Sequence, residues 1–336
     1  MTAGRNRQIE EFLYAAGWAG AKRVDLAQDA SFRRYERILL GGKSAVLMDA
    51  PPDKEDVRPF VAIASILRGL GLSAPELYAQ DAGRGLLLLE DLGDDTYTQV
   101  LAADPDREDG LYALATDVLI ALHSRFSESA AVPPYDDARL QAEADLLLDW
   151  YLPAVTGKAV PDTVRRDYAA LWDELFPPAR AVPSTLVLRD YHVDNLMWLP
   201  QRPDLAACGL LDFQDAVIGP VAYDLVSLFE DARRDVPPAL ARKGLDRYLA
   251  AFPDLDPDAL RAAYAILGAQ RSAKILGIFT RLDRRDGKPD YLCHLPRVWR
   301  WLDSDLAHPA LSGLRAWFDR NLPPAIRVIP ERTTGK

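Results

Sequence analysis

Polar side chains interrupt an apolar stretch at residues 185–199, TLVLRDYHVDNLMWL, and their types suit proton and cation chemistry. Asp190 and Asn195 lie in this stretch, and Asp212 follows a second apolar run in the sequence GLLDFQDA. A carboxylate can align an acceptor hydroxyl and accept its proton, while an amide oxygen and a second carboxylate are ligands of the kind that Mg²⁺ prefers. This combination and its spacing indicate phosphoryl transfer.

Composition and charge narrow the classes of partner. The chain has 336 residues, enough for two lobes with separate cores, and its 50 acidic and 40 basic residues give a formal charge of −10. Without a strongly basic block, we expect neither nucleic acid nor a membrane as a partner. Cys208 and Cys293 lie far apart, which disfavours a disulfide framework and predicts a reducing, cytoplasmic location. We expect a monomer.

The elements that must position these residues change in type along the chain. Strand-like runs on either side of the glycine pair at 41–42 predict a β-hairpin, a helix is expected over 54–71, and 85–97 contains a buried strand that ends in acidic residues. Beyond residue 97 the apolar periodicity is helical. The expected helices cover 107–124, 137–152, 161–176, 222–234, 239–252 and 258–283. The exception is a pair of short strands near 185–189 and 208–213.

These patterns predict an α+β fold with two lobes. The smaller lobe, residues 1–90, would be an antiparallel sheet with an N-terminal helix and one packed helix. The larger lobe, residues 91–336, would be mainly helical and would contain a catalytic loop at 188–195 and a metal loop at 211–216.

With these parts in order, the chain resembles the aminoglycoside-phosphotransferase and choline-kinase-like branch of the protein-kinase fold over essentially its whole length. A finer resemblance is to the bacterial cell-wall sugar kinases, which phosphorylate the anomeric hydroxyl of N-acetylmuramate and N-acetylglucosamine during peptidoglycan recycling. The segments that carry it are DASFRRY (29–35), MDAPPDKED (48–56), LLLEDLGDDTY (87–97), RDYHVDNLM (189–197) and LDFQDAVIGPVAYDLVSL (211–228).

The resemblance assigns roles to particular residues. It implies that Asp190 is the catalytic base and that Asn195 and Asp212 bind Mg²⁺. The residues that it implies for ATP are Ser31, Phe32, Arg33 and Arg34 in a phosphate-covering turn, and Glu90, Asp91 and Leu92 beside adenine. Two positions depart from the usual pattern. Leu188 stands where these kinases commonly have histidine, and Met48 stands where a lysine usually reaches the phosphates. Arg33, Arg34 or Lys54 would then supply the cation.

Three further residues are candidates for the acceptor substrate: His192, Asp215 and Arg271. His192 either contacts the sugar or is a satisfied structural histidine, and Asp215 either joins the site or caps the following turn. Arg271 and Lys274 either face the acceptor or belong to the solvated edge of a core helix. Asp224 is expected to be structural, tying its helix to the catalytic loop.

The leading hypothesis is therefore an ATP- and Mg²⁺-dependent kinase that acts on the anomeric hydroxyl of a small amino sugar. One alternative is a kinase of the same fold that acts on another alcohol, such as choline, homoserine or an aminoglycoside. The other is a catalytically silent nucleotide-binding protein, which the departures at Met48 and Leu188 suggest.

Overall fold

The computed structural model describes residues 3–26, 32–127 and 132–331 and divides into two compact units. Unit 1 comprises Met1–Leu114 and Val193–Asp215, and unit 2 comprises Ala115–His192 and Ala216–Lys336. The lobe boundary at residues 90–91 stays a prediction.

Unit 1 contains an antiparallel sheet of five strands in the order β1-β2-β3-β5-β4. The strands are β1 (Lys22–Asp25), β2 (Arg34–Leu40), β3 (Lys43–Asp49), β4 (Leu77–Asp81) and β5 (Leu86–Glu90). Its remaining elements are α1 (Ala3–Ala15), α2 (Arg58–Gly69), α3 (Tyr97–Ala103), η1 (Pro105–Arg107), the start of α4 (Glu108–Arg125), β7 (Leu196–Trp198), η3 (Asp204–Ala207) and β8 (Cys208–Leu210). Leu40 pairs with Lys43 across the glycine turn, so the predicted hairpin is confirmed.

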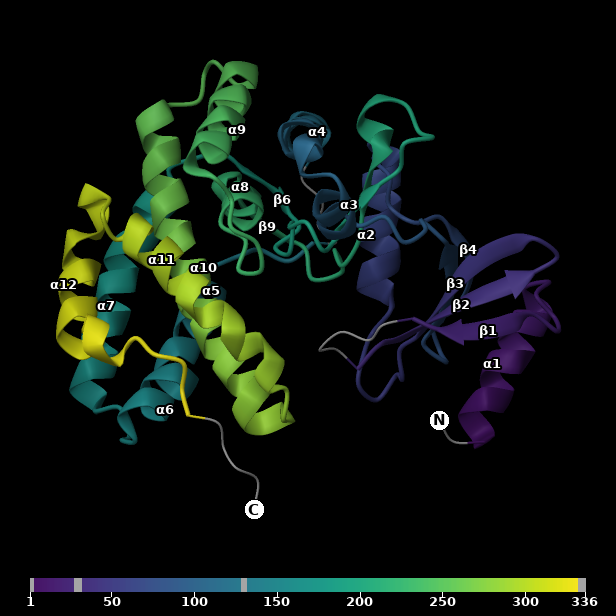
Figure 1. Ribbon diagram of the computed structural model, residues 1–336, viewed down its shortest axis with the longest axis horizontal. Coiled ribbons are helices and arrows are strands. Elements are labelled where there is room, and N and C mark those ends of the chain that lie inside the picture. The colour runs from purple at the N-terminus through teal and green to yellow at the C-terminus, as the bar shows by residue number, and fades with distance from the viewer. Residues whose placement is uncertain (1–2, 27–31, 128–131, 332–336) are drawn as a thin grey trace. The chain divides into compact units, whose positions relative to one another are not determined.

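The two faces of this sheet have different neighbours because successive side chains of a strand point to opposite faces. One face carries Ile38, Leu47 and Leu88, which pack in a buried cluster with Ile9 and Phe12 of α1. Figure 1 shows α1 beside this sheet. The residues that alternate with this cluster along the strands point to the other face. The sheet therefore has one closed apolar face and one face left for other contacts.

Unit 2 is mainly helical. Its helices are the end of α4, α5 (Asp137–Ala144), the π-helical turn η2 (Leu147–Tyr151), α6 (Leu152–Thr156), α7 (Asp162–Ala179), α8 (Ala222–Phe229), α9 (Pro238–Ala251), α10 (Pro257–Asp286), η4 (Pro289–His294), α11 (Leu295–Asp305), η5 (Pro309–Leu311), α12 (Ser312–Asn321) and η6 (Pro324–Ile326). The long helix α10 contacts α5, η2, α7, α8 and α11, so it is the element around which the others are arranged (Figure 1). Most of its residues from Leu260 to Asp283 are buried.

The short strands expected near 185–189 and 208–213 are present as β6 (Ser184–Val187) and β8. Strand β6 pairs with β9 (Val217–Pro220), and β8 pairs with β7. One prediction about local structure was wrong. The helix expected to reach residue 234 ends at Phe229. There the side chain of Asp231 accepts a hydrogen bond from the amide of Arg233 at 2.7 Å, which turns the chain away from the helix axis.

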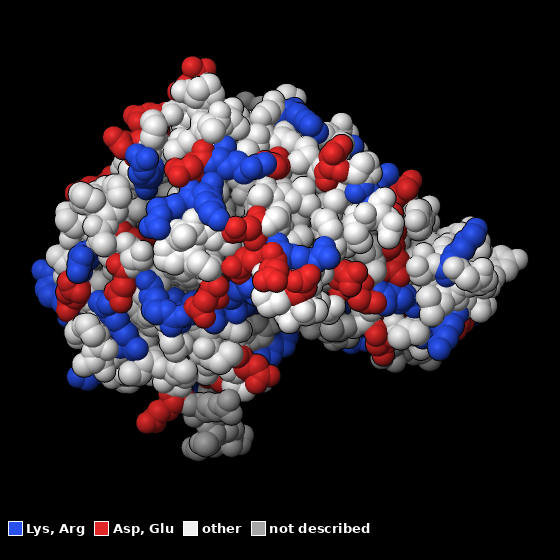
Figure 2. All heavy atoms as spheres, turned by 45° about the horizontal axis from the view of Figure 1, so that its top comes forward, with Lys and Arg blue, Asp and Glu red and all other residues white. Residues whose placement is uncertain are grey.

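Charged side chains of both signs are intermingled on the molecular face drawn in Figure 2. Ion pairs at the surface of the described residues include Arg297 with Asp235 at 2.8 Å and Arg247 with Asp117 at 2.6 Å. Within the described residues, no helix combines the length and the apolar character that crossing a bilayer requires.

Helix α10 approaches the end of α5 without an intervening side chain. A Cβ atom placed on Gly277 would lie only 2.3 Å from the carbonyl carbon of Leu146, a distance at which backbone has to move. Overpacking of this kind typically costs about 1–3 kcal/mol. Glycine is therefore required at this contact for steric reasons.

We expect Gly277→Ala to lower the free energy of unfolding by about 1–3 kcal/mol because the added methyl group displaces the backbone near Leu146. Urea denaturation followed by circular dichroism would measure this change. Gly110→Ala is the matched control, because Gly110 lies in α4 and a methyl group added to it would have no heavy atom within 4 Å. That substitution should leave stability unchanged or raise it by up to about 1 kcal/mol. Equal effects of the two substitutions would contradict the steric argument.

Candidate active site

In unit 1 a cavity of about 290 Å³ has a largely apolar wall. Its apolar side chains include Leu26, Val46, Phe60, Leu89, Met197 and Leu211. Val46 and Leu89 belong to the sheet face opposite the α1 cluster, Phe60 belongs to α2, and Met197 belongs to β7. Apolar walls with a few polar groups at the edge are typical of sites for small organic ligands. This cavity is therefore suited to a small organic ligand.

The predicted adenine-binding residues Glu90, Asp91 and Leu92 all line this cavity. The amide of Glu90 donates to the carbonyl oxygen of Glu76 at 2.8 Å, and the Glu90 carboxylate pairs with Arg202 at 2.5 Å. Glu90 is thus engaged through both its amide and its side chain. We therefore expect the backbone at Asp91 and Leu92 to provide the contacts to a base.

Arg37 of β2 forms ion pairs with the segment from Asp91 to Asp94. Its Nε lies 2.8 Å from Oδ2 of Asp91, and its Nη2 lies 2.8 Å from Oδ1 of Asp94. Hydrogen bonding to Asp94 raises the pKa of Arg37 above its ordinary value, so the guanidinium stays charged. Sequence reasoning missed Arg37, because a single arginine on an alternating strand gives no signal of a distant partner.

Asn195 and Asp212 also line the cavity, so the structure brings the two predicted metal ligands to the same enclosed space. The carbonyl oxygen of Asn195 accepts a hydrogen bond from the amide of Leu211 at 3.0 Å, which links the two short segments. Asp212 has φ 56°, in the left-handed region that non-glycine residues rarely adopt. Gln214 donates to Oδ1 of Asp212 at 2.8 Å, and the exposed Asp215 lies beside them. These amide and carboxylate oxygens form a donor set that suits Mg²⁺.

The predicted phosphate-binding residues have different surroundings. Ser31 lies outside the described residues, Phe32 is exposed with Lys54 Nζ 5.9 Å from its ring centroid, and Arg34 is exposed. Arg33 is largely buried, with Nη2 3.6 Å from Oδ1 of Asp212. Of the cations proposed from the sequence, Arg33 is thus the one placed beside a candidate metal ligand.

Met48 is buried in β3, between Tyr35 of β2 and Leu87 of β5, and it points to the same sheet face as Val46, which lines the cavity. It provides no charge there. Burial lowers the pKa of Arg33, but the negative groups around it, including Asp212, outweigh burial and raise the pKa overall. Arg33 therefore remains a cation at this edge of the cavity.

In unit 2 the loop that contains Asp190 is fixed through its backbone. The carboxylate of Asp224 accepts hydrogen bonds from the amides of Leu188 at 2.6 Å and Arg189 at 2.9 Å, which confirms the structural role predicted for Asp224. Burial raises the pKa of Asp224 to about 7, although these two donors act in the opposite direction. Arg189 has φ 71°, and its carbonyl oxygen accepts a hydrogen bond from Ser227 at 3.0 Å. The loop is thus anchored on helix α8.

Basic residues of unit 2 influence the charge state of Asp190. Burial raises its pKa, but the electrostatic effects of Lys274, His192, Arg271 and Arg189 outweigh burial and leave the pKa below its ordinary value. Asp190 is therefore an ionised carboxylate at neutral pH. An ionised carboxylate is what a residue that accepts a proton requires.

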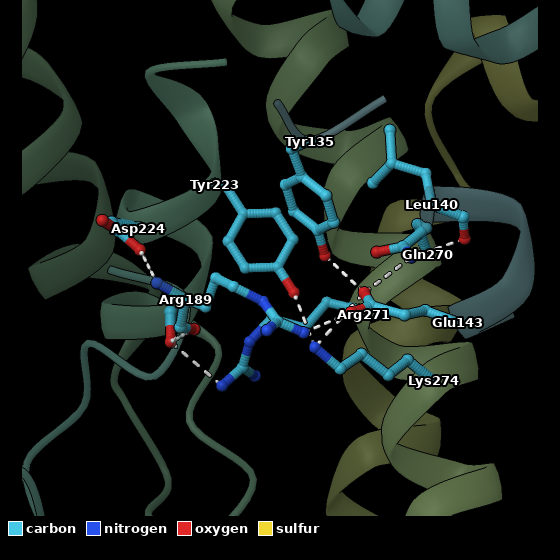
Figure 3. Close-up of polar contacts among 10 residues, drawn as sticks. Tyr135, Leu140, Glu143, Arg189, Tyr223, Asp224, Gln270, Arg271 and Lys274 are labelled. Carbon is cyan, nitrogen blue, oxygen red and sulfur yellow. Dashed lines mark hydrogen bonds and ion pairs between the residues drawn. The ribbon is translucent and has the colours of Figure 1, made fainter. Parts of the chain in front are cut away.

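Glu143 of α5 is the centre of a largely buried polar cluster that sequence reasoning missed (Figure 3). Its carboxylate forms an ion pair with Arg189, lies 3.3 Å from Nζ of Lys274, and accepts hydrogen bonds from Tyr135 and Gln270. Figure 3 shows the side chains of Arg189 and Lys274 reaching this carboxylate from different elements. We refer to Tyr135, Glu143, Arg189 and Lys274 as the Glu143 cluster.

The interpretation of α10 as a core helix with a solvated edge at Arg271 and Lys274 was wrong, because both residues are buried. Arg271 donates to the hydroxyl of Ser227 at 3.0 Å and to the carbonyl oxygen of Glu230 at 3.5 Å. His192 is also buried, and Arg233 Nη1 lies 3.3 Å from its Nε2. Polar partners on other elements thus compensate the burial of these groups. Contact of His192, Asp215 or Arg271 with a substrate stays a prediction.

Comparison with known proteins adds three findings. The sequence model of the phosphotransferase enzyme family (APH) matches residues 23–263. The chain is 40% identical to an N-acetylmuramate/N-acetylglucosamine kinase from Caulobacter vibrioides, over 96% of this chain and 99% of that protein. It is 39% identical to a protein of the same description from Pseudomonas aeruginosa, over 91% of each chain.

Solved structures confirm the predicted fold. The choline kinase LicA from Streptococcus pneumoniae is similar with a TM-score of 0.65 and 14% identity, covering 91% of this chain and 100% of that chain. The streptomycin–ATP–APH(2″)-IIa ternary complex is similar with a TM-score of 0.59 and 16% identity, covering 86% and 94% of the two chains. A small antiparallel sheet and a larger helical part, as expected from the sequence, are therefore those of the protein-kinase-like fold.

We expect Asp224→Asn to lower the free energy of unfolding by about 1–3 kcal/mol at pH 8, because an amide replaces one of two buried acceptor oxygens with a donor. Chemical denaturation at this pH measures the change. Asp117→Asn is the control, since it breaks an exposed ion pair with Arg247 and should cost less than about 1 kcal/mol. A loss no larger for Asp224→Asn than for the control would contradict the anchoring role.

Proposed function

We propose that this chain, which belongs to the phosphotransferase enzyme family, transfers a phosphoryl group from ATP to the anomeric hydroxyl of N-acetylmuramate and N-acetylglucosamine. The proposed substrates rest on the sequence identity of 38–40% with three proteins described as N-acetylmuramate/N-acetylglucosamine kinases. Each similarity extends over more than nine-tenths of this chain. The choice of the anomeric hydroxyl rests on the sequence resemblance described above.

The cavity of unit 1 supports binding of ATP. Its apolar wall would enclose adenine, and the backbone at Asp91 and Leu92 would provide hydrogen bonds to the base. Arg33 would meet the phosphates, since a guanidinium donates in a planar fork that matches phosphate oxygens. It would thereby replace the lysine that Met48 does not provide.

Asn195 and Asp212 would hold Mg²⁺ through an amide oxygen and a carboxylate. The bound ion would neutralise charge on the phosphate oxygens. The left-handed backbone of Asp212 and its hydrogen bond from Gln214 keep this carboxylate in one orientation. Arg33, 3.6 Å from the same carboxylate, balances its charge before a ligand binds.

Asp190 would orient the sugar hydroxyl and accept its proton. The sugar oxygen forms a bond to the γ-phosphorus, the bond from that phosphorus to the β–γ bridging oxygen breaks, and ADP leaves. An anomeric hydroxyl is more acidic than an ordinary alcohol, so orientation by Asp190 contributes more than its basicity. The lowered pKa of Asp190 suits this role, because the carboxylate is ionised before the sugar arrives.

The alternatives are less well supported. The structural likeness to a choline kinase comes with only 14% identity and carries the fold alone. A catalytically silent protein usually lacks the base or a metal ligand, whereas Asp190, Asn195 and Asp212 are all present.

The purified protein should phosphorylate N-acetylmuramate and N-acetylglucosamine in the presence of Mg·ATP, and removal of Mg²⁺ with EDTA should abolish turnover. Thermal-shift measurements with Mg·ATP, followed by ³¹P NMR of the product, would test this. A phosphorus resonance coupled to the anomeric proton identifies the acceptor hydroxyl. Transfer to choline, homoserine or an aminoglycoside in the same panel, with none to the sugars, would refute the proposal.

We expect Asp190→Asn to lower kcat by about 10²–10⁴-fold, because the hydroxyl loses its general base. The matched control is Asp194→Asn, a carboxylate in the same stretch that accepts a hydrogen bond from Thr98 within unit 1. The control should stay within about tenfold of the unsubstituted protein. Steady-state kinetics on both variants, with circular dichroism to establish folding, measures the difference. A folded Asp190→Asn variant with undiminished kcat would eliminate Asp190 as the base.

A further inference from the structure

We propose that Glu143 is a positioning residue for phosphoryl transfer: it holds Arg189 and Lys274 in place and through them fixes the backbone and the electrostatic surroundings of Asp190. The inference rests on the proposed function, since it concerns the same base. It goes beyond that function because Glu143 lies on α5, outside every motif that indicates a kinase.

The first step is the link from Glu143 to the backbone of the loop. Arg189 directly precedes Asp190 and has φ 71°, a conformation that costs a non-glycine residue roughly 1–2 kcal/mol. Asp224 and Ser227 hold its amide and carbonyl groups, and Glu143 holds its guanidinium. The residue next to Asp190 is therefore fixed at its amide, its carbonyl and its side chain.

The second step is the link from Glu143 to Lys274, whose positive charge acts on Asp190. Lys274 heads the positive groups that keep the pKa of Asp190 low, and its Nζ lies 3.3 Å from Glu143 and 3.4 Å from the hydroxyl of Tyr223. Burial raises the pKa of Glu143, but Lys274 and Arg189 outweigh burial and lower it. A buried ammonium group without such a carboxylate is an uncompensated charge, which is unfavourable.

The third step is that one carboxylate serves both cations. Arg189 contacts Oε1 and Lys274 contacts Oε2 of Glu143, so the two oxygens are divided between the loop and α10 (Figure 3). Removal of this single charge leaves the buried Lys274 and the largely buried Arg189 without their shared anion. Loss of Glu143 should therefore act on Asp190 through these two cations.

We expect Glu143→Gln to lower kcat by about 10- to 100-fold, the size of effect that a small misplacement of a reacting group produces. The Michaelis constant for ATP should change less than about threefold, because the residues proposed to bind ATP belong to unit 1, whereas Glu143, Arg189 and Lys274 belong to unit 2. Tyr135→Phe removes one hydrogen bond to the same carboxylate and leaves both ion pairs, so its effect should be much smaller. Asp149→Asn breaks an exposed ion pair with Arg165 and is the neutral control.

A double-mutant cycle separates positioning from general destabilisation. Lys274→Met removes a partner of the same carboxylate, so the two substitutions break the same ion pair. The double variant Glu143→Gln/Lys274→Met should therefore have a kcat within about threefold of that of the less active single variant. Independent losses would multiply and would overturn the proposal. A kcat for folded Glu143→Gln within about twofold of the unsubstituted protein would also overturn it.

The pH profile of Lys274→Met provides a measurement that does not require a folded Glu143 variant. Arg189, Arg271, His192 and Lys274 lower the pKa of Asp190, whereas the neighbouring carboxylate of Asp224 opposes its ionisation. Loss of Lys274 should therefore raise the pH of the acid limb of kcat, and an unshifted limb would overturn the proposal.

An unsubstituted protein without kinase activity would refute the proposed function. An active protein with unaffected Glu143 and Lys274 variants would refute this inference alone.

Discussion

The conformation of the loop around Asp190 depends on two carboxylates in the protein interior that accept hydrogen bonds from backbone amides and pair with cations. Asp224 receives the amides of Leu188 and Arg189, and Glu143 receives the guanidinium of Arg189. Without these contacts, the left-handed conformation of Arg189 would be unfavourable by roughly 1–2 kcal/mol. Two carboxylates on different helices therefore determine the shape of the segment that is proposed to carry the base.

The parts proposed to bind nucleotide and metal depend on a different constraint, the alternation of side chains along β-strands. In β2, β3 and β5 one set of residues packs against α1, and the alternating set contributes Arg37, Val46 and Leu89 to the cavity. A shift of one residue in the strand register would exchange these sets. The same pairing that closes the apolar core of unit 1 thus also determines which groups line the cavity.

Local patterns in the sequence predicted much of this arrangement. The glycine pair at 41–42 and its flanking strands are a local signal, and the structure contains the hairpin. Asn195 and Asp212 were predicted as metal ligands partly because each adjoins an apolar strand, and both line one cavity. By contrast, the pairing of β6 with β9 and of β7 with β8 depends on contacts between segments that no local pattern specifies.

The same limit explains the residues that were missed or misjudged. Glu143 is one of two acidic residues on α5, and its partner Arg189 lies 46 positions later, so nothing near Glu143 distinguishes it from a solvated residue. Arg271 and Lys274 have the charge of surface residues but are buried, because partners from other elements neutralise or hydrogen-bond them. Charge predicts exposure only where no such partner exists.

The absence of a side chain at Gly277 has a geometric consequence for the Glu143 cluster. Gly277 and Leu146 touch backbone to backbone, and Lys274 and Glu143 each lie three residues earlier on the same two segments. Residues three apart on a helix are on the same side of it. The close approach of Gly277 to Leu146 therefore brings the ammonium of Lys274 and the carboxylate of Glu143 near each other, about one turn away. The absence of a side chain at Gly277 thereby lets the two segments come close enough for this ion pair.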